Sequence, residues 1–211
     1  MDKYLATFQS WDKLASQYQE KFMDLDLYDD TYDLFCQLIK KPNATIFEIG
    51  CGSGNITKYL LAKRPDFNIL ATDVAPSMIV LAQQNNPTAK FMVMDARKID
   101  ALNSKFNGIM CGFCMPYLSK EDCLKLIKDS SDLLEVDGVF YGSAIEGNYD
   151  LSDYETSSDG QVKMFVYYHQ TDYLLESFKE NNMEVIDLIR KKYQKSDGTT
   201  SIHLIIIAKK K

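Results

Sequence analysis

Three glycines at alternate positions follow an apolar run and precede a helical pattern. The run extends from Thr45 to Ile49, the glycines are Gly50, Gly52 and Gly54, and helical spacing of apolar residues starts at Ile56. A buried strand, a glycine turn and a helix are the arrangement with which parallel sheets bind nucleotides. Glycine tolerates positive φ and lets a ligand approach the backbone, and the helix N-terminus adds unpaired N–H groups. This stretch therefore predicts a nucleotide-like ligand.

The acidic residue before the turn narrows the kind of ligand. Glu48 stands two residues before the first glycine, where its carboxylate would repel a pyrophosphate, and the spacing differs from the Gly-x-Gly-x-x-Gly of dinucleotide sites. A ligand with an ammonium or sulfonium group fits better. The stretch resembles the first motif of class I S-adenosylmethionine-dependent methyltransferases, E/D-x-G-x-G-x-G. The resemblance implies that Glu48, Gly50, Cys51, Gly52 and Gly54 bind S-adenosylmethionine; a turn that only joins strand to helix is the alternative.

Asp73 is the second acidic candidate. It ends the second predicted strand about 20 residues beyond the turn, where a nucleoside-binding crossover places a carboxylate for the ribose hydroxyls. Such hydroxyl-to-carboxylate hydrogen bonds are charge-assisted. The alternative is an N-cap for the helix that starts at Pro76. If Asp73 binds ribose, Val74 and Met78 flank the adenine.

The resemblance also implies roles at the ends of later strands. Members of the family often place an acidic residue after the third strand, which makes Asp95 the acceptor of the adenine N–H and Ala96 the backbone facing the ring; a loop aspartate without a ligand is the alternative. Ligands lie beyond the carboxyl ends of the strands, so Cys111 and Phe113 are expected to line the methionine portion. Tyr18 matches a position where relatives cover the cofactor with an aromatic ring, although a core-facing tyrosine is equally consistent.

Two histidines and one cysteine pair are the remaining candidates for chemistry. His169 follows two tyrosines and precedes a helix on the acceptor side, so it is the candidate catalytic residue. His203 lies in an apolar strand and is predicted to be structural. Cys111 and Cys114 could act in redox chemistry or as half of a zinc site. A structural zinc needs four ligands and no second pair exists, so no metal site is predicted and the pair is interpreted as small residues lining a crevice.

The elements that must position these residues alternate between strand and helix. Helical spacing predicts two helices before the alternation, at 11–22 and 28–39. The core strands are predicted at 45–49, 67–73, 90–95, 108–113 and 139–145, and the core helices at 55–63, 76–85 and from a capping box at Ser119 to about 135. Residues 147–160 are rich in Ser and Asp and predict an insertion or mobile loop.

The last part of the chain predicts the closing elements of the sheet. Residues 162–168 are β-like, Thr171 is expected to cap a helix, and strands at 184–190 and 201–208 are joined by a turn at 196–198. The predicted fold is a doubly wound α/β structure. Its seven-stranded, mostly parallel sheet has a C-terminal antiparallel hairpin and an N-terminal helical cap, as in the Rossmann-like methyltransferase fold that the resemblance implies. One domain spans 1–211, with a cap at 1–41, a cofactor-binding core at 42–146 and an acceptor-side region at 147–211.

Composition limits the partners. The chain has 211 residues, a formal net charge of −6 and five cysteines without framework spacing. An acidic total argues against a nucleic-acid partner, and no apolar stretch is long enough for a membrane span. The odd cysteine count and the lack of a signal-peptide pattern at the N-terminus predict reduced thiols in the cytoplasm.

We therefore expect a methyltransferase that moves a methyl group from S-adenosylmethionine to a small-molecule acceptor, as a monomer or homodimer. A dinucleotide-dependent oxidoreductase is one alternative, and a non-catalytic S-adenosylmethionine-binding module is another. The core alternation provides no lid, and transfer requires a closed, dry site. We expect the N-terminal helices and residues 147–169 to form the acceptor pocket together.

Overall fold

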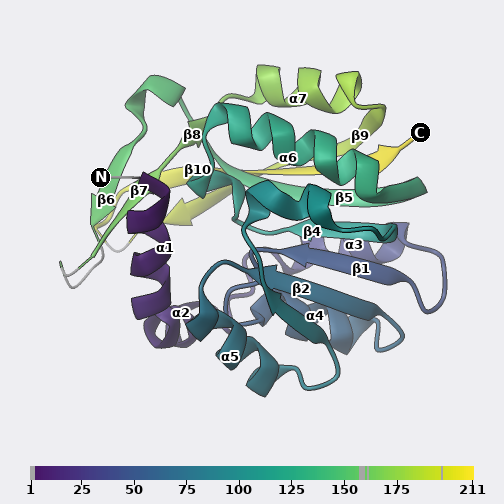
Figure 1. Cartoon of the computed structure of the whole chain (residues 1–211). Coiled ribbons are helices and arrows are strands. Elements are labelled where there is room, and N and C mark those ends of the chain that lie inside the picture. Colours follow the sequence, from purple (N-terminus) through teal and green to yellow (C-terminus); the bar gives the residue numbers. More distant parts are fainter. Residues whose placement is uncertain (1–2, 157–159, 161, 196) are drawn as a thin grey trace.

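The computed structural model describes residues 3–156, 160, 162–195 and 197–211 of the chain. A central sheet separates two layers of helices (Figure 1). Its strands are β1 (Thr45–Ile49), β2 (Asn68–Asp73), β3 (Lys90–Val93), β4 (Phe106–Cys111), β5 (Leu134–Glu146), β8 (Tyr168–His169), β9 (Met183–Gln194) and β10 (Thr200–Lys210). The main order is β3-β2-β1-β4-β5-β10-β9, and β8 pairs with β5 beside it. Strands β1 to β5 pair in parallel and β10 is antiparallel to both neighbours, which confirms the predicted fold class.

The apolar run of β1 is explained by burial on both faces of the sheet. Ile46 packs with residues of α3 (Asp29–Leu38), α4 (Asn55–Lys63) and α5 (Pro76–Asn85). Phe47 and Ile49 pack on the opposite face, against α6 (Lys120–Leu133) and α7 (Thr171–Glu180). Successive side chains of a strand point to opposite faces, so a strand between two helical layers needs apolar residues throughout. Figure 1 shows α6 on the near side of the sheet and α3 and α4 on the far side.

The prediction of one helix from Trp11 to Phe22 is wrong. The structure has α1 (Lys3–Lys13) and α2 (Ala15–Phe22), and Leu14 between them has φ −89° and ψ 5°, which is not helical. The break lets the chain turn while its aromatic residues still face one side. Helical spacing alone continues across such a break, so the periodicity of apolar residues did not reveal it.

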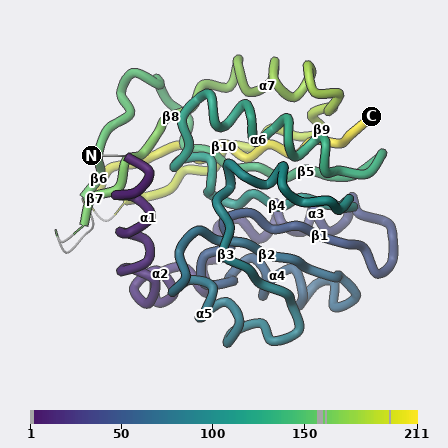
Figure 2. The backbone as a smooth tube through the Cα atoms, in the orientation of Figure 1, coloured from purple at the N-terminus to yellow at the C-terminus, as the bar shows by residue number. Residues whose placement is uncertain are grey.

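Helix α1 lies beside a second, two-stranded sheet made of β6 (Asp153–Thr156) and β7 (Lys163–Val166), as Figures 1 and 2 both show. The Ser10 hydroxyl donates to the Lys163 carbonyl at 2.8 Å, and the Phe165 N–H donates to Thr7 Oγ1 at 3.0 Å. Part of the predicted polar loop is thus the strand β6, while residues 157–159 and 161 lie outside the described residues. The two segments that flank the core in sequence are therefore joined in space.

Several element boundaries differ from their predictions. The bounds of β1, α4 and α5 agree, whereas β5, β9 and β10 are longer and β4 starts and ends two residues earlier. Ser119 caps α6 as predicted by accepting the Asp122 N–H at 3.2 Å. Thr171 is the first residue of α7 and not its cap, and its hydroxyl donates to Glu146. The predicted turn residue at position 196 lies outside the described residues, and short 3-10 turns occur at Ala96–Ala101, Met115–Tyr117 and Tyr149–Leu151.

Among the helices of the described chain, none has the length and apolar character that crossing a bilayer requires.

Candidate functional site

The glycine turn connects the end of β1 to the start of α4. Gly50 and Gly52 have φ values of +69° and +54°, a region that disfavours residues with a side chain. A Cβ at Gly50 would lie 2.9 Å from Cys114 Cβ, and one at Gly52 would lie 2.9 Å from Tyr18 Cε1. The turn therefore needs glycine both for its conformation and for the close approach of whatever covers it.

Glu48 is a buried acid with one unsatisfied oxygen. Its side chain is 1% exposed, and its Oε2 accepts a hydrogen bond from Thr57 Oγ1 at 2.6 Å. Its Oε1 has no hydrogen-bond partner within the described part of the chain. Burial raises the pKa of Glu48 to about 8. Buried polar atoms are normally paired. We therefore expect a ligand to place a hydrogen-bond donor or a positive group beside this oxygen.

Asp73 joins the end of β2 to the glycine turn. Its Oδ2 accepts the Gly52 N–H at 2.9 Å and its Oδ1 accepts the Ala75 N–H at 2.9 Å. Burial raises the pKa of this carboxyl. Ala75 is the N-cap position of α5, so Asp73 supports the helix start through a backbone amide without capping it directly. The Asp73 carboxylate predicted to bind the ribose hydroxyls is thus the same group that supports the start of α5.

We expect Asp73→Ala to weaken binding of S-adenosylhomocysteine by roughly 1.5–3 kcal/mol, the scale for a charged hydrogen-bond partner. Asp73→Asn is the matched control, because its amide oxygen can still accept one N–H of the turn. Isothermal titration calorimetry measures the affinity and thermal unfolding measures the stability. A lower melting temperature of Asp73→Ala with unchanged affinity would show that the carboxylate only shapes the turn.

The residues predicted to hold the adenine follow β2 and β3, two strands that pair side by side. Val74 follows β2 and is half-buried, and Met78 is buried against Ala75 and the N-terminal helices. Asp95 is already engaged: both of its oxygens bind the Arg97 guanidinium, with Nε at 3.0 and 3.1 Å, and Oδ1 also accepts the Arg97 N–H. Ala96 is partly buried beside this pair. A ligand at Asp95 must therefore share the carboxylate with Arg97.

An aromatic ring, that of Tyr18 in α2, covers the turn, and the end of β4 lies beside it. Cys111 is fully buried at the end of β4, and the N–H of Phe113 donates to Ser143 Oγ at 2.7 Å. Tyr18 lies on Gly52, with its ring 5.6 Å from that of Trp11. Tyr18 thus covers Gly52 in this structure, and its role of covering the cofactor stays a prediction.

His169 belongs to β8 and lies opposite Glu146 at the carboxyl end of β5. It is fully buried, its Nε2 lies 2.9 Å from the carbonyl oxygen of Met115, and its Nδ1 lies 2.5 Å from Tyr173 Oη. Cys123 of α6 is a further neighbour. Burial lowers the pKa of His169 to about 4. Both ring nitrogens thus have partners in the folded chain, and the catalytic role of His169 stays a prediction.

His203 also lies near the predicted site. Its ring is 4.9 Å from Phe113 and 6.0 Å from Tyr28. Sequence reasoning assigned it a structural role because its neighbours in the strand are apolar. The antiparallel pairing of β10 with β5 places His203 opposite Ile145, at the ligand edge. One feature of the sequence indicates this position, namely a single polar residue within an apolar strand.

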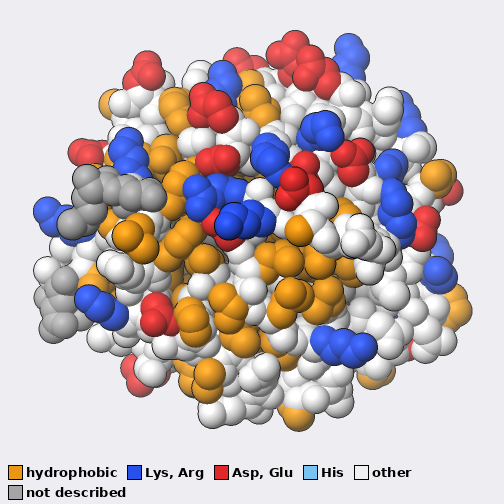
Figure 3. Space-filling view, in the orientation of Figure 1, with side chains coloured by type: hydrophobic (Ala, Val, Ile, Leu, Met, Phe, Trp, Pro, Cys, Tyr) orange, Lys and Arg blue, Asp and Glu red, His pale blue; other side chains and the backbone are white. Residues whose placement is uncertain are grey.

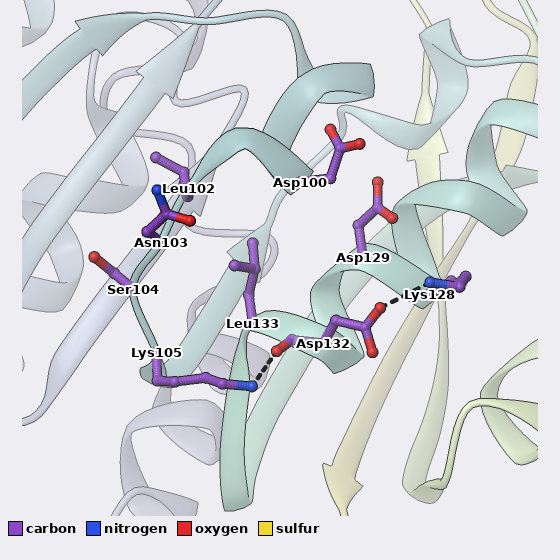
Figure 4. Close-up of a pocket in the computed structure, with 9 residues that line it drawn as sticks. All are labelled: Asp100, Leu102, Asn103, Ser104, Lys105, Lys128, Asp129, Asp132 and Leu133. Atoms are coloured by element: carbon purple, nitrogen blue, oxygen red, sulfur yellow. Dashed lines mark hydrogen bonds and ion pairs between the residues drawn. The ribbon is translucent and has the colours of Figure 1, made fainter.

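A separate cavity of about 360 Å³ lies away from the turn. Figure 4 shows its lining at the start of β4 and the end of α6, where Lys128 pairs with Asp132 at 2.8 Å. Since β4 points its carboxyl end toward the glycine turn, this cavity is at the opposite end of the strand. The other charged groups of the lining are also engaged: Lys105 donates to the Asp132 carbonyl, and Asp100 and Asp129 pair with Lys125 outside the lining. Within the described residues no group of three or more metal-ligating side chains could hold a metal ion.

Comparison with known proteins relates this site to a family. Residues 46–138 match the family model described as a methyltransferase domain. The putative methyltransferase 235L of Invertebrate iridescent virus 6 is 28% identical over 114 residues, which are 54% of this chain and 41% of that protein. The tRNA N(3)-methylcytidine methyltransferase trm141 of Schizosaccharomyces pombe is 24% identical over 161 residues, which are 72% of this chain and 65% of that protein. The chain thus spans less than two thirds of the length of these curated relatives.

A solved structure supports the same relationship at the level of fold. Magnesium protoporphyrin IX methyltransferase of Synechocystis PCC 6803 superimposes with a TM-score of 0.72 at 14% identity, covering 100% of this chain and 98% of that one. Three observations point to the same kind of protein: the order of strands in the sheet, the glycine turn with its acidic residue, and the match to a methyltransferase domain. Residues 46–138 are thus similar in sequence to methyltransferase domains, and the chain has the fold of a solved methyltransferase.

Proposed function

We propose that the protein binds S-adenosylmethionine at the glycine turn and catalyses transfer of its methyl group to a small-molecule acceptor. The observation that carries the proposal is the unpaired Oε1 of buried Glu48 beside a turn of positive-φ glycines. A ligand with a positive group fits this oxygen, and a pyrophosphate does not. The cofactor supplies a methyl group that its sulfonium already activates.

Residues of the chain then have distinct tasks. Gly50, Cys51, Gly52 and Gly54 would let the ligand approach the backbone, and Asp73 would bind the ribose. Val74, Met78, Asp95 and Ala96 would surround the adenine, and Cys111 and Phe113 the methionine portion. Tyr18 would close over the ligand and exclude water, which aligned methyl transfer needs.

A small acceptor is favoured by the surface and by the cover of the site. Basic and acidic side chains are mixed on the face that Figure 3 shows, where hydrophobic side chains gather below them and no large basic area appears. The formal net charge of −6 also disfavours a polyanionic acceptor. Hydrogen bonds join α1 to β7, and a cover made of these two segments would leave room for a small acceptor rather than a macromolecule. The five cysteines are free thiols, which fits a reducing compartment such as the cytoplasm.

The test compares ligands that the alternatives distinguish. Calorimetry is expected to show binding of S-adenosylhomocysteine and no binding of NADH. Transfer of radiolabelled methyl groups from S-adenosylmethionine to a pooled metabolite extract is expected to label low-molecular-mass products. Binding of NADH alone would favour an oxidoreductase, and binding of S-adenosylhomocysteine without any transfer would favour a non-catalytic module.

A further inference from the structure

His203 lies at the sheet edge that carries the glycine turn. It belongs to β10 and pairs with Ile145, one residue before β5 ends at Glu146. Strands β1 and β4 run parallel to β5 and end at the same edge. Ligands of doubly wound sheets bind beyond this edge. Because β10 is antiparallel to β5, the side chain of His203 lies at the edge of the sheet where ligands bind.

Both ring nitrogens of His203 contact hydroxyl groups. Its Nδ1 lies 2.6 Å from Tyr28 Oη, and its Nε2 lies 3.0 Å from Ser201 Oγ. A hydroxyl can donate and accept at once, so a proton that reaches Tyr28 can continue to His203 without movement of the ring. Burial and the neighbouring Lys195 lower the pKa of His203 to about 4, so the resting imidazole is neutral and one of its nitrogens is an acceptor.

Aromatic rings surround this hydrogen-bonded chain. The Phe113 ring is 4.8 Å from that of Tyr28, and Tyr193 stacks on His203 at 4.8 Å with an interplanar angle of 14°. Tyr28 and His203 are buried, whereas Phe113 and Tyr193 are partly exposed. The outer rings, Phe113 and Tyr193, are thus in contact with solvent. The hydrogen-bonding atoms belong to the buried pair, Tyr28 and His203. A flat ring that displaces an outer ring would keep the same stacking contacts.

We propose that Tyr28 and His203 form a proton relay for the methyl acceptor, and that the acceptor is a planar aromatic molecule bearing a hydroxyl or amino group. The proposal rests on the proposed methyl transfer and adds the class of acceptor to it. Tyr28 is the residue that would touch the acceptor. His203 would act through Tyr28 as a positioning residue, with Ser201 holding its other nitrogen.

The proton balance of the step is as follows for an aromatic hydroxyl. The acceptor oxygen uses an electron pair to form a bond to the methyl carbon, and the electron pair of the carbon–sulfur bond stays with sulfur. The O–H bond of the acceptor breaks, its proton passes to Tyr28 Oη, and the proton of Tyr28 passes to His203 Nδ1. An oxygen that has gained a carbon substituent is a strong acid, so a weakly basic imidazole suffices. The imidazolium then releases the proton to solvent.

The two histidines of the chain make a direct test possible. The full chain, labelled with ¹⁵N-histidine and saturated with S-adenosylhomocysteine, is titrated with phenol, aniline or cyclohexanol and followed by NMR of the ring nitrogens. We expect phenol and aniline to shift the His203 signals while the His169 signals stay in place. Cyclohexanol, which carries a hydroxyl on a ring that is not planar, is expected to have little effect. The substitution His203→Gln assigns the signals.

Variants add a second readout. Tyr28→Phe and His203→Gln are expected to lower turnover of an aromatic acceptor about 100-fold or more, the lower end of the range for general acid–base catalysis, with affinity for S-adenosylhomocysteine changed less than about twofold. Tyr32→Phe, one turn along in the same aromatic cluster, is the matched control and should behave like the wild type. Equal shifts of both histidines, an effect of cyclohexanol as large as that of phenol, or no shift with either aromatic probe would overturn the proposal. Failure to bind S-adenosylhomocysteine at the first step would instead refute the proposed function.

Discussion

Gly52→Val is expected to lower the affinity for S-adenosylhomocysteine at least 100-fold. A side chain at Gly52 would project into the space that the Tyr18 ring now fills, since a Cβ there lies 2.9 Å from Tyr18 Cε1 and 3.4 Å from its hydroxyl oxygen. A ligand that replaces Tyr18 on the turn would meet the same obstacle. The N–H of Gly52 also binds Asp73, so displacement of the turn would move the carboxylate proposed to hold the ribose. Calorimetry measures the loss.

The matched control separates obstruction from backbone strain. Gly198 has φ +84° in the β9–β10 turn, and a Cβ there would meet nothing within 4 Å. Gly198→Val therefore carries a strain of about 1–2 kcal/mol, comparable to that expected at Gly52, but leaves the ligand edge untouched. It should lower the melting temperature and keep wild-type affinity. Unchanged affinity in Gly52→Val, or an equal loss in Gly198→Val, would mean that the turn does not contact the ligand.

The local parts of the fold could be predicted because the sequence signals them locally. The apolar run from Thr45 to Ile49 predicts a strand that is buried on both faces, and Pro76 indicates the start of α5. The glycines report a backbone conformation that only they adopt easily. The break at Leu14 was missed since helical spacing continues through it. The strand β6 was missed because its exposed polar residues resemble a loop, and its pairing with β7 is not visible in either segment alone.

The sequence indicates which residues lie near the motif, but not which distant segments meet there, and the binding roles of these residues stay predictions. Glu48 and Asp73 are close to the glycine turn because β1 and β2 pair side by side. The bidentate binding of Asp95 by Arg97 depends on side-chain conformation, which residue types do not specify. The placement of the two histidines has a similar cause. Both lie at the carboxyl end of β5, and their partners depend on how β8 and β10 pair with that strand.

Burial of Glu48 implies that the acid which prepares the site for a cation also destabilises the ligand-free fold. Its pKa is about 8 in the folded protein against the ordinary value of 4.5. The folded state therefore holds this proton more tightly than the unfolded chain does. Its contribution to stability is complete below pH 4.5, decreases as the pH rises toward 8 and is lost above that value. A cation bound beside Oε1 would reverse the cost by stabilising the carboxylate.

Glu48→Gln is accordingly expected to have opposite effects on stability and on binding. The amide mimics the protonated acid and can still accept from Thr57, so at pH 8.5 the free energy of unfolding of the ligand-free variant should rise by about 2 kcal/mol or more, with little change at pH 4.5. Affinity for S-adenosylhomocysteine should fall about 10- to 100-fold, because a charged hydrogen-bond partner is lost. Urea unfolding across this pH range and calorimetry measure the two effects.

Proton release identifies the group responsible. Calorimetry at pH 7 in buffers of different ionisation enthalpy should show that the wild type releases most of one proton on binding S-adenosylhomocysteine, and that Glu48→Gln releases none. Glu146→Gln is the control: Arg190, 2.7 Å away, holds the pKa of Glu146 below its ordinary value, so this acid is already ionised at pH 7 and its loss should leave proton release unchanged. If Glu48→Gln binds as tightly as the wild type and releases the same proton, Glu48 serves only to anchor Thr57, and another residue must meet the positive group of the ligand.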